Sequence, residues 1–444
     1  MRPWLKGLAM RDYLIVSVVL ASLPIGLVRP YYGLLVYAWI SYMNPHMLAW
    51  SFAQSFPVAK IAAISTVAGL IITRSADTSP IRHRETIVMA LMWCMFTVST
   101  LLAVNPTDAW PQWQDTSKLI VMAVIASMLL TSRERIRYFL LVIALSIGFY
   151  GFKGGIFSVM GRGEGMVWGP GNSIIAGNNN IGLALNMCLP LLWYLASEER
   201  GWRKLGLYVM FGLSIPAIMF TYSRASFLTL LAVLLAIVLR CRHRLALICL
   251  ALAAIPFVMP FVPQKFWDRQ ATTLEYETDG SAQSRLDNWQ FCWRVALDRP
   301  LTGAGFQFFT PEMIERYDPS FGVTYAGKAW DTHNIYFAML TAHGFPGLLL
   351  FVLLLAFCFL SSIRLRRQVR YRDDLKWIVG YCYTVEASLL ALIINGAFVN
   401  MEYFDLVYHL PAVIVSLKLI ARQILLTTQP ERVMDTAQFA CAAN

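Results

Sequence analysis

Two arginines and one histidine have the types and positions needed to bind a phosphorylated substrate and to move a proton. Arg224 lies between two apolar runs that are separated by only a few residues, and Arg285 lies at the start of an amphipathic stretch. His333 joins a long polar segment to the apolar run that follows it. A guanidinium group matches phosphate oxygens with a fixed fork of donors, so both arginines are candidate ligands of a diphosphate. The histidine is a candidate proton acceptor.

The surroundings of His333 suggest how its ring could stay neutral. We expect His333 to open a helix, with Asp331 or Thr332 as the N-cap. The partial positive charge of a helix N-terminus disfavours an imidazolium ion, and the exposed N–H groups favour a nearby phosphate. His343, by contrast, is followed at once by a glycine and is predicted to end a helix. The alternatives are a snorkelling interfacial role for Arg224 and a solvated position for Arg285.

Three further polar residues are candidate substrate contacts. Lys153 lies near the end of an apolar span beside two glycines, where phosphate contact and snorkelling are equally plausible. Asn178 and Asn180 could contact a sugar or could cap buried backbone. The acidic residues between 275 and 279 could bind a cation, although a solvated acidic turn is favoured. No Asp-x-Asp sequence occurs on the predicted external side, so we expect no metal and no cofactor.

The composition identifies the setting in which these residues work. Apolar residues make up 57% of the chain and charged residues 14%, and the mean hydropathy is +0.55. So few polar groups cannot cover a globular surface, which excludes an ordinary soluble protein. Apolar stretches of about 16 to 22 residues recur, the length that a helix needs to cross a bilayer. We therefore predict an all-α, polytopic membrane protein of about 12 transmembrane helices.

The net charge of +11 is distributed in a way that excludes nucleic-acid binding. About 24 of the 37 lysines and arginines lie in seven short clusters between apolar spans. This pattern is the positive-inside bias of membrane proteins, so the clusters are predicted to be cytoplasmic. The neutral connections then lie outside, together with Arg224, Arg285 and His333.

The alternation of spans predicts four regions. Residues 1–262 form an N-terminal transmembrane bundle of about nine spans, and residues 263–332 form a long external loop. Residues 333–426 form a C-terminal bundle of about three spans, and residues 427–444 form a cytoplasmic tail. Both termini are expected inside, which requires that the run 31–43, bracketed by Pro30 and Pro45, is a broken or re-entrant piece.

The external loop is predicted to be partly helical and to carry the chemistry. Loops longer than about 15 residues are usually functional or disordered, and this one is rich in tryptophan. Residues 281–298 form a predicted amphipathic helix with Leu286, Trp289, Trp293 and Leu297 on one face, stopped by a proline at position 300. Two glycines at 303 and 305 indicate a tight turn.

Several short motifs follow one another in a fixed order around this loop. They are Tyr222-Ser223-Arg224-Ala225-Ser226, Ser284-Arg285 with Trp289, Pro300-Leu301-Thr302-Gly303-Ala304-Gly305-Phe306, His333-Asn334-Ile335-Tyr336 and Gly344-Phe345-Pro346-Gly347. In these motifs, over roughly residues 178–359, the chain resembles the O-antigen ligase and O-antigen polymerase superfamily of bacterial inner-membrane proteins. The head of the chain, with Pro30-Tyr31-Tyr32-Gly33 and Asn44-Pro45-His46, looks like the extension of a branch labelled exosortase-associated O-glycosylation ligases.

The resemblance implies a specific reaction. Members of the superfamily move a glycan from a polyprenyl diphosphate to an acceptor without a metal. For this chain the implied activity is an inverting, metal-independent transfer of O-antigen from undecaprenyl diphosphate to a sugar hydroxyl, with lipid A-core or another glycan as acceptor. The external arginines and loop histidine of the family match Arg224, Arg285 and His333. The implied location is the inner membrane of a Gram-negative bacterium, with the active site facing the periplasm and membrane lipids around the spans.

The alternatives differ in acceptor or in class. An O-antigen polymerase or a protein O-glycosylation ligase would share the same motifs. A twelve-span transporter would match the number of spans, but transporters of that size usually show repeated halves and functional charge near the midplane. We find no internal repeat in this sequence, and its candidate charges lie at one face.

Overall fold

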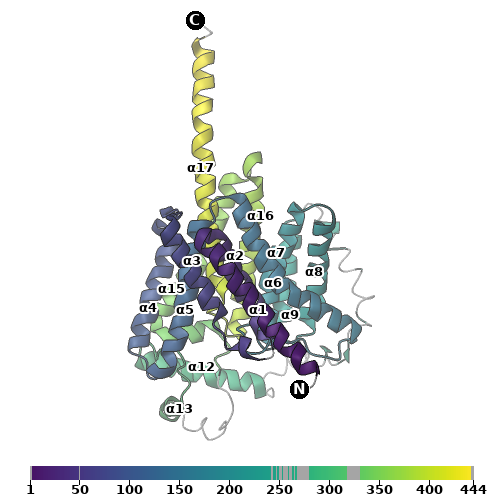
Figure 1. Cartoon of the computed structure of the whole chain (residues 1–444), viewed down its shortest axis with the longest axis vertical. Coiled ribbons are helices and arrows are strands. Elements are labelled where there is room, and N and C mark those ends of the chain that lie inside the picture. Colours follow the sequence, from purple (N-terminus) through teal and green to yellow (C-terminus); the bar gives the residue numbers. More distant parts are fainter. Residues whose placement is uncertain are drawn as a thin grey trace.

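In a computed structural model, the chain folds into a bundle of long helices (Figure 1). The structure describes residues 3–49, 51–241, 244–246, 248–249, 253, 259, 263–264, 266–267, 280–317 and 331–441. Every named element within these residues is an α-helix or a short 3-10 helix, which confirms the all-α prediction.

Six helical segments of the described part are long and apolar enough to cross a membrane, and two shorter apolar helices accompany them. This confirms a polytopic α-helical protein, whereas the total of about twelve spans stays a prediction. The predicted span at 245–262 lies mostly outside the described residues. The six segments are Met10–Val28, Arg133–Met160, Asn178–Glu198, Ile335–Val369, Asp373–Phe398 and Asp405–Thr427.

The head of the chain forms three helices, α1 (Pro3–Val28), α2 (Pro30–Met43) and α3 (Val58–Thr73). The expected broken piece at 31–43 is therefore wrong: a proline at the first position and a left-handed Asn44 at the end delimit a regular helix. The Tyr31 hydroxyl donates to the Arg135 carbonyl at 3.0 Å, and the Tyr150 hydroxyl donates to the Met43 carbonyl. The full length of α2 thus runs alongside the first part of α6 (Arg133–Met160).

Because α2 is a regular helix, the N-terminus lies at a different end of the bundle from the one predicted. Asp12 of α1 accepts hydrogen bonds from the backbone N–H groups of Ser51 and Ala53, each at 3.0 Å, so the start of α1 lies beside the connection between α2 and α3. In Figure 1 the two chain ends lie at opposite ends of the bundle. The expectation that both termini share one side is therefore wrong, because three helices rather than two precede Arg74.

The centre of the bundle is α7 (Asn178–Glu198), of which nearly every residue between Ile181 and Leu192 is buried. It packs against α6, α8 (Gly201–Met219), α9 (Arg224–Val238) and α16 (Lys376–Asn395). A second group of contacts joins α15 (Ile335–Val369) to α4 (Arg84–Leu101), and α17 (Asp405–Cys441) to α5 (Pro106–Leu129). Outside the bundle, α12 (Gly280–Asp298) and α13 (Pro311–Tyr317) lie at the end opposite the C-terminus (Figure 1).

Buried carboxylates hold the basic ends of the helices together. Glu386 accepts from Arg240 at 2.9 Å and from Arg366 at 3.0 Å, which joins α9, α15 and α16. Glu85 accepts from Lys418 at 2.7 Å, which joins α4 and α17. Removal of one partner from such a pair leaves an uncompensated buried charge, so these contacts fix the end of the bundle opposite α12.

Candidate active site

The segment that carries His333 is held by α12. The Asn288 side-chain amide donates to the Asp331 carbonyl at 2.8 Å, and the Trp289 indole N–H donates to the Thr332 carbonyl at 2.9 Å. The Trp289 ring also stacks on Phe337, with centroids 5.5 Å apart. Two side chains of the loop helix therefore fix the backbone immediately before His333.

A single amide side chain fixes the same segment from the other side. Asn400 Oδ1 accepts from the Asn334 backbone N–H at 2.9 Å and from the Thr332 hydroxyl. Asn334 also donates through its side chain to the Ala397 carbonyl at 3.1 Å. The segment is thus held between the loop helix and the 399–404 connection.

The N-cap of α15 is Asn334, not Asp331 or Thr332 as expected. The Asn334 side-chain oxygen accepts from the backbone N–H groups of Tyr336 and Phe337, at 2.9 and 3.1 Å. His333 precedes the cap and has a φ of 47°, in the left-handed region. A non-glycine residue in this region costs roughly 1–2 kcal/mol and persists only where its neighbours impose it. The hydrogen bonds on both sides of His333 supply that constraint.

The pKa of His333 is lowered from its ordinary value. Burial of the ring is the main cause, and the positive charge of Arg285 adds to it, while the Asp331 carboxylate opposes it. His333 Nδ1 lies 3.6 Å from Asp331 Oδ2, and 38% of the His333 side chain is exposed. The neutral imidazole expected from the sequence is therefore favoured, but by burial and Arg285 rather than by a helix N-terminus.

A buried glutamate in the 399–404 connection is the second unusual group. Burial and the nearby negative charge of Asp331 raise the pKa of Glu402 to about 8. Its Oε2 atom is buried and has no hydrogen-bond partner among the described residues. Glu402 is therefore protonated at neutral pH and can donate a hydrogen bond rather than accept a proton. Burial is not visible in the sequence, so the raised pKa of Glu402 could not be predicted from it.

A cavity of about 490 Å³ opens beside Asp331, Thr332 and Glu402. Its wall combines the segment after the loop glycines with the segment before α15 and the 399–404 connection. Carboxyl, amide and aromatic groups line the cavity, as in sites that bind a polar ligand with an apolar face. The residues that matter most here are Gln112, Phe306, Asp331, Thr332, Glu402 and Tyr403.

The two arginines occupy different places relative to this cavity. Arg285 lies in the second turn of α12 and is half-buried. Burial raises the pKa of Asp331, and the charge of Arg285 opposes that rise, whereas at His333 the same charge adds to the lowering of the pKa by burial. Arg224 is the first residue of α9, after the N-cap Ser223. The beginning of α9 is joined to α16 by a 3.1 Å hydrogen bond from Asn395 to Ser226. The charge of Arg285 thus acts on His333, and the contact between α9 and α16 places Arg224 at the same end of the bundle.

The loop glycines have a structural role. Gly344 interrupts α15 with a φ of 67°, and the freed carbonyls of Thr341 and Ala342 accept from the N–H groups of Ala304 and Gly305 at 2.8 and 2.9 Å. A Cβ atom on Gly305, which has a φ of 85°, would lie 2.3 Å from the Ala103 side chain. The predicted tight turn is confirmed, and its function is to complete the hydrogen bonds of the broken helix.

His343 is the last residue before this break, as predicted, but it is more than a helix end. Its ring is fully buried, with Nδ1 2.6 Å from the Ser99 hydroxyl and Nε2 2.7 Å from the Tyr403 hydroxyl. Phe96 packs on it with centroids 4.2 Å apart. His343 therefore links α4, α15 and the 399–404 connection.

The predicted loop helix is confirmed, and three of the four residues of its apolar stripe are exposed, while Trp289 packs against Phe337. Leu286, Trp293 and Leu297 are 40%, 47% and 59% exposed, whereas Phe291 and Val295 are fully buried. Trp293 contacts Phe345, a partly exposed residue of α15, with centroids 6.0 Å apart. A membrane protein buries one face in protein and presents another to lipid, so this stripe fits a helix at the bilayer surface.

The remaining predicted contacts lie elsewhere on the bundle. The side-chain amide of Asn178 donates to the Thr221 carbonyl at 2.9 Å, and that of Asn180 donates to the Ile174 carbonyl at 2.9 Å. Both thus cap backbone groups, and a glycan contact for them stays a prediction. Lys153 is exposed on α6, and its substrate role also stays a prediction.

Metal binding is not tested by this structure. Among the described residues, no three His, Cys, Asp or Glu side chains are grouped closely enough to hold a metal ion. The acidic residues at 275–279 lie outside the described residues. Metal-independent transfer therefore stays a prediction.

Two family models match the chain. Residues 209–352 match the O-antigen ligase family, and residues 10–198 match a family of unknown function. The ligase match contains Arg224, Arg285 and His333, and it ends inside α15. No curated protein matches the chain.

Proposed function

We propose that the chain transfers a glycan from undecaprenyl diphosphate to a hydroxyl group of an acceptor sugar, because residues 209–352 match the O-antigen ligase family. The proposed acceptor is lipid A-core. The observation that carries the proposal is a cavity lined by Asp331 and Thr332, directly before His333, whose neutral ring is favoured by burial and by the charge of Arg285. These groups supply a proton acceptor, a phosphate ligand and room for the reacting sugars.

The proposed reaction is a single displacement. His333 takes the proton of the acceptor hydroxyl while its oxygen forms a bond to the anomeric carbon of the donor. The bond from that carbon to the diphosphate oxygen breaks, and the electron pair leaves with undecaprenyl diphosphate. Arg224 and Arg285 stabilise the charge that grows on the leaving diphosphate. The configuration at the anomeric carbon is inverted, and no metal is needed because arginine supplies the positive charge.

The identity of the acceptor distinguishes an O-antigen ligase from a polymerase and from a protein O-glycosylation ligase. Purified protein in nanodiscs is supplied with an undecaprenyl-diphosphate glycan and, in separate reactions, with lipid A-core, a second donor molecule or an acceptor protein. Glycosylated lipid A-core in EDTA and without ATP would support the ligase. Chain growth on the donor would identify a polymerase, and a glycosylated protein would identify an O-glycosylation ligase. Movement of the donor without any transfer would favour the transporter.

The location that we propose is the inner membrane of a Gram-negative bacterium, with α12 in the periplasm. A Gly280→Cys variant should react with a membrane-impermeant maleimide in intact cells. A Ser75→Cys variant, exposed near the opposite end of the bundle, should react only after lysis. Wild-type protein gives the background, which should be small at Cys292 because that thiol is buried. Labelling of Gly280→Cys only after lysis would contradict the proposed topology.

The pH dependence of transfer should follow the proton on His333. Its lowered pKa predicts that kcat/KM is half-lost at a pH below 6.5, since the ring can no longer accept a proton once it is charged. Arg285→Gln removes a positive charge, so this midpoint should move to higher pH. Asp331→Asn removes a negative charge, so the midpoint should move to lower pH. Arg316→Gln, on a side chain that is 66% exposed, should leave it unchanged. Midpoints that move together in one direction would contradict the proposed base.

A further inference from the structure

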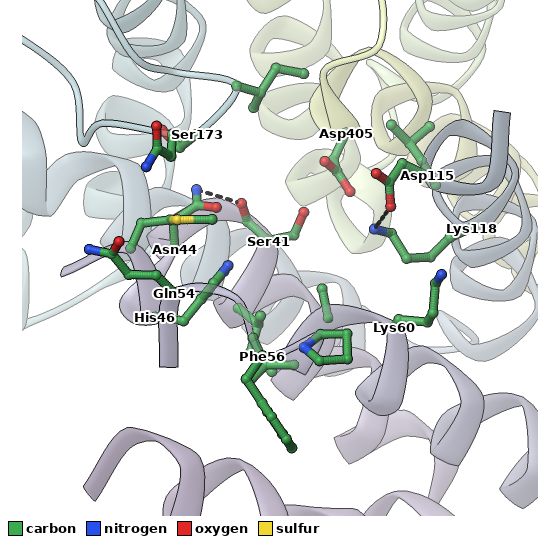
Figure 2. A pocket seen from close by; sticks show the side chains of 18 of the residues that line it. Ser41, Asn44, His46, Gln54, Phe56, Lys60, Asp115, Lys118, Ser173 and Asp405 are labelled. Atoms are coloured by element: carbon green, nitrogen blue, oxygen red, sulfur yellow. Dashed lines mark hydrogen bonds and ion pairs between the residues drawn. The ribbon is translucent and has the colours of Figure 1, made fainter. Parts of the chain in front are cut away.

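A second cavity, of about 580 Å³, adjoins the proposed catalytic cavity. Gln112 of α5 and Tyr403 of the 399–404 connection line both of them. A ligand that fills the second cavity can therefore extend past these two side chains towards Asp331. Figure 2 shows the second cavity, with Asp115 and Asp405 on one side and Asn44 and Gln54 on the other.

The wall of this cavity comes almost entirely from residues 10–198, the region that matches the family of unknown function. Only Tyr403 and Asp405 lie outside residues 10–198. The other wall residues come from the end of α2, the 3-10 helix η1 (Pro45–Leu48), residues 54–57, the beginning of α3, part of α5 and residues 172–174. The ligase family match does not reach any of them.

The charges of the cavity balance each other. Lys118 pairs with Asp115 at 3.0 Å, and Lys60 donates to Gln114 at 3.0 Å. Asp405 accepts from the Tyr37 hydroxyl at 3.0 Å. The wall thus carries two ammonium groups and two carboxylates. A diphosphate would need a surplus of positive charge, so this wall does not fit the phosphorylated part of the donor.

The neutral polar groups fit the hydroxyl groups of a sugar. A sugar hydroxyl both donates and accepts hydrogen bonds, and the wall offers amides from Asn44 and Gln54 and hydroxyls from Ser41 and Ser173. Phe56 adds an apolar surface for the C–H face of a sugar ring. Ligand cavities typically measure about 300–1,000 Å³, so this one has room for more than a single small group.

The wall also contains a buried histidine. His46 is only 9% exposed, and its Nδ1 atom is buried without a hydrogen-bond partner in the part of the chain that the structure describes. Burial and the charge of Lys118 lower the pKa of His46, so its ring is neutral near pH 7. A neutral ring adds no charge to the wall, which agrees with an uncharged ligand.

We propose that this second cavity binds the sugar end of the acceptor and presents its hydroxyl to the site around His333. The inference rests on the proposed function, because it assigns one of the two substrates of that reaction. It gives the region of residues 10–198 a role in acceptor binding, while the ligase region carries the chemistry.

Kinetics on lipid A-core tests this assignment. Asp115→Asn removes one charged hydrogen-bond partner, so it should raise the KM for the acceptor roughly 10- to 100-fold and leave the KM for the donor unchanged. Asp373→Asn is the matched control, since Asp373 forms the same i,i+3 pair with Lys376 at the other end of the bundle. An unchanged acceptor KM in Asp115→Asn, while wild-type protein transfers normally, would overturn the acceptor site and leave the proposed function standing.

A binding measurement tests the cavity without any turnover. Ser55→Cys places a thiol on the rim of the cavity, and Ser75→Cys places one near the opposite end of the bundle. Lipid A-core oligosaccharide freed of its fatty acids, at about ten times its Kd, should slow maleimide labelling of Ser55→Cys about tenfold. Labelling of Ser75→Cys should not change. Equal labelling of Ser55→Cys with and without the oligosaccharide would overturn the proposal, whether or not the protein transfers a glycan.

Discussion

His333→Ala should lower the rate of glycan transfer by roughly 10²–10⁴, which is the usual contribution of a general base. Expression and donor binding should stay close to those of the wild type, because proton transfer is needed only in the transition state and the diphosphate is held by the arginines. The measurement is donor affinity alongside turnover, on the same preparation of purified protein. His83→Ala is the matched control, since His83 lies at the opposite end of the bundle.

A proportional loss of donor affinity and rate in His333→Ala would mean that the residue is a phosphate or structural contact. Asp331 would then be the next candidate for the proton. Glu402 would not replace it at neutral pH, because its pKa of about 8 keeps it protonated. His343→Ala is not a suitable control, because the loss of the buried links to Ser99 and Tyr403 should lower the stability of the bundle.

Arg224→Lys and Arg285→Lys should each lower transfer by roughly 10²–10³, the usual effect of removing one donor to a transition-state charge. Lysine keeps the charge but loses the planar fork that binds two phosphate oxygens at once. Arg316→Lys should keep full activity, since Arg316 is 66% exposed and its partner is Asp298 on the surface of α12, 3.1 Å away. The comparison uses initial rates at saturating acceptor. Similar tolerance at all three positions would count against the assignment of the diphosphate to Arg224 and Arg285.

The sequence predicted the helix that organises the site because its signals are local. The spacing of Leu286, Trp293 and Leu297 and the proline at position 300 delimit α12 to within one residue. The same spacing does not say which face is buried. In a membrane protein the apolar stripe can face lipid, and here the buried face is the one that carries Phe291 and Val295.

The constraint on His333 could not be predicted, because it depends on partners far away in the sequence. Asn288 and Asn400 lie more than 40 residues from the segment they hold. The same contacts place Asn334, rather than Asp331 or Thr332, at the N-cap position. The raised pKa of Glu402 has the same origin, since it depends on tertiary burial.

The number of helices at the head was mispredicted for a related reason. Helix α2 has only 14 residues, so its length alone does not indicate a span. The direction of α2 through the bundle depends on its packing along α6, where Tyr31 and Tyr150 form hydrogen bonds between the two helices. The positive-inside rule is a statistical bias over many clusters, so one cluster at the start of the chain did not fix the position of that end.

The anomeric configuration of the product tests the proposed single displacement most directly. Purified protein is given an undecaprenyl-diphosphate glycan whose anomeric linkage is α, and the new linkage is determined by NMR while the released undecaprenyl diphosphate is quantified. The account predicts a β linkage, with one undecaprenyl diphosphate released for each glycan transferred. An α linkage in the product would contradict it, because retention requires a second displacement and a covalent intermediate that a base at His333 does not provide.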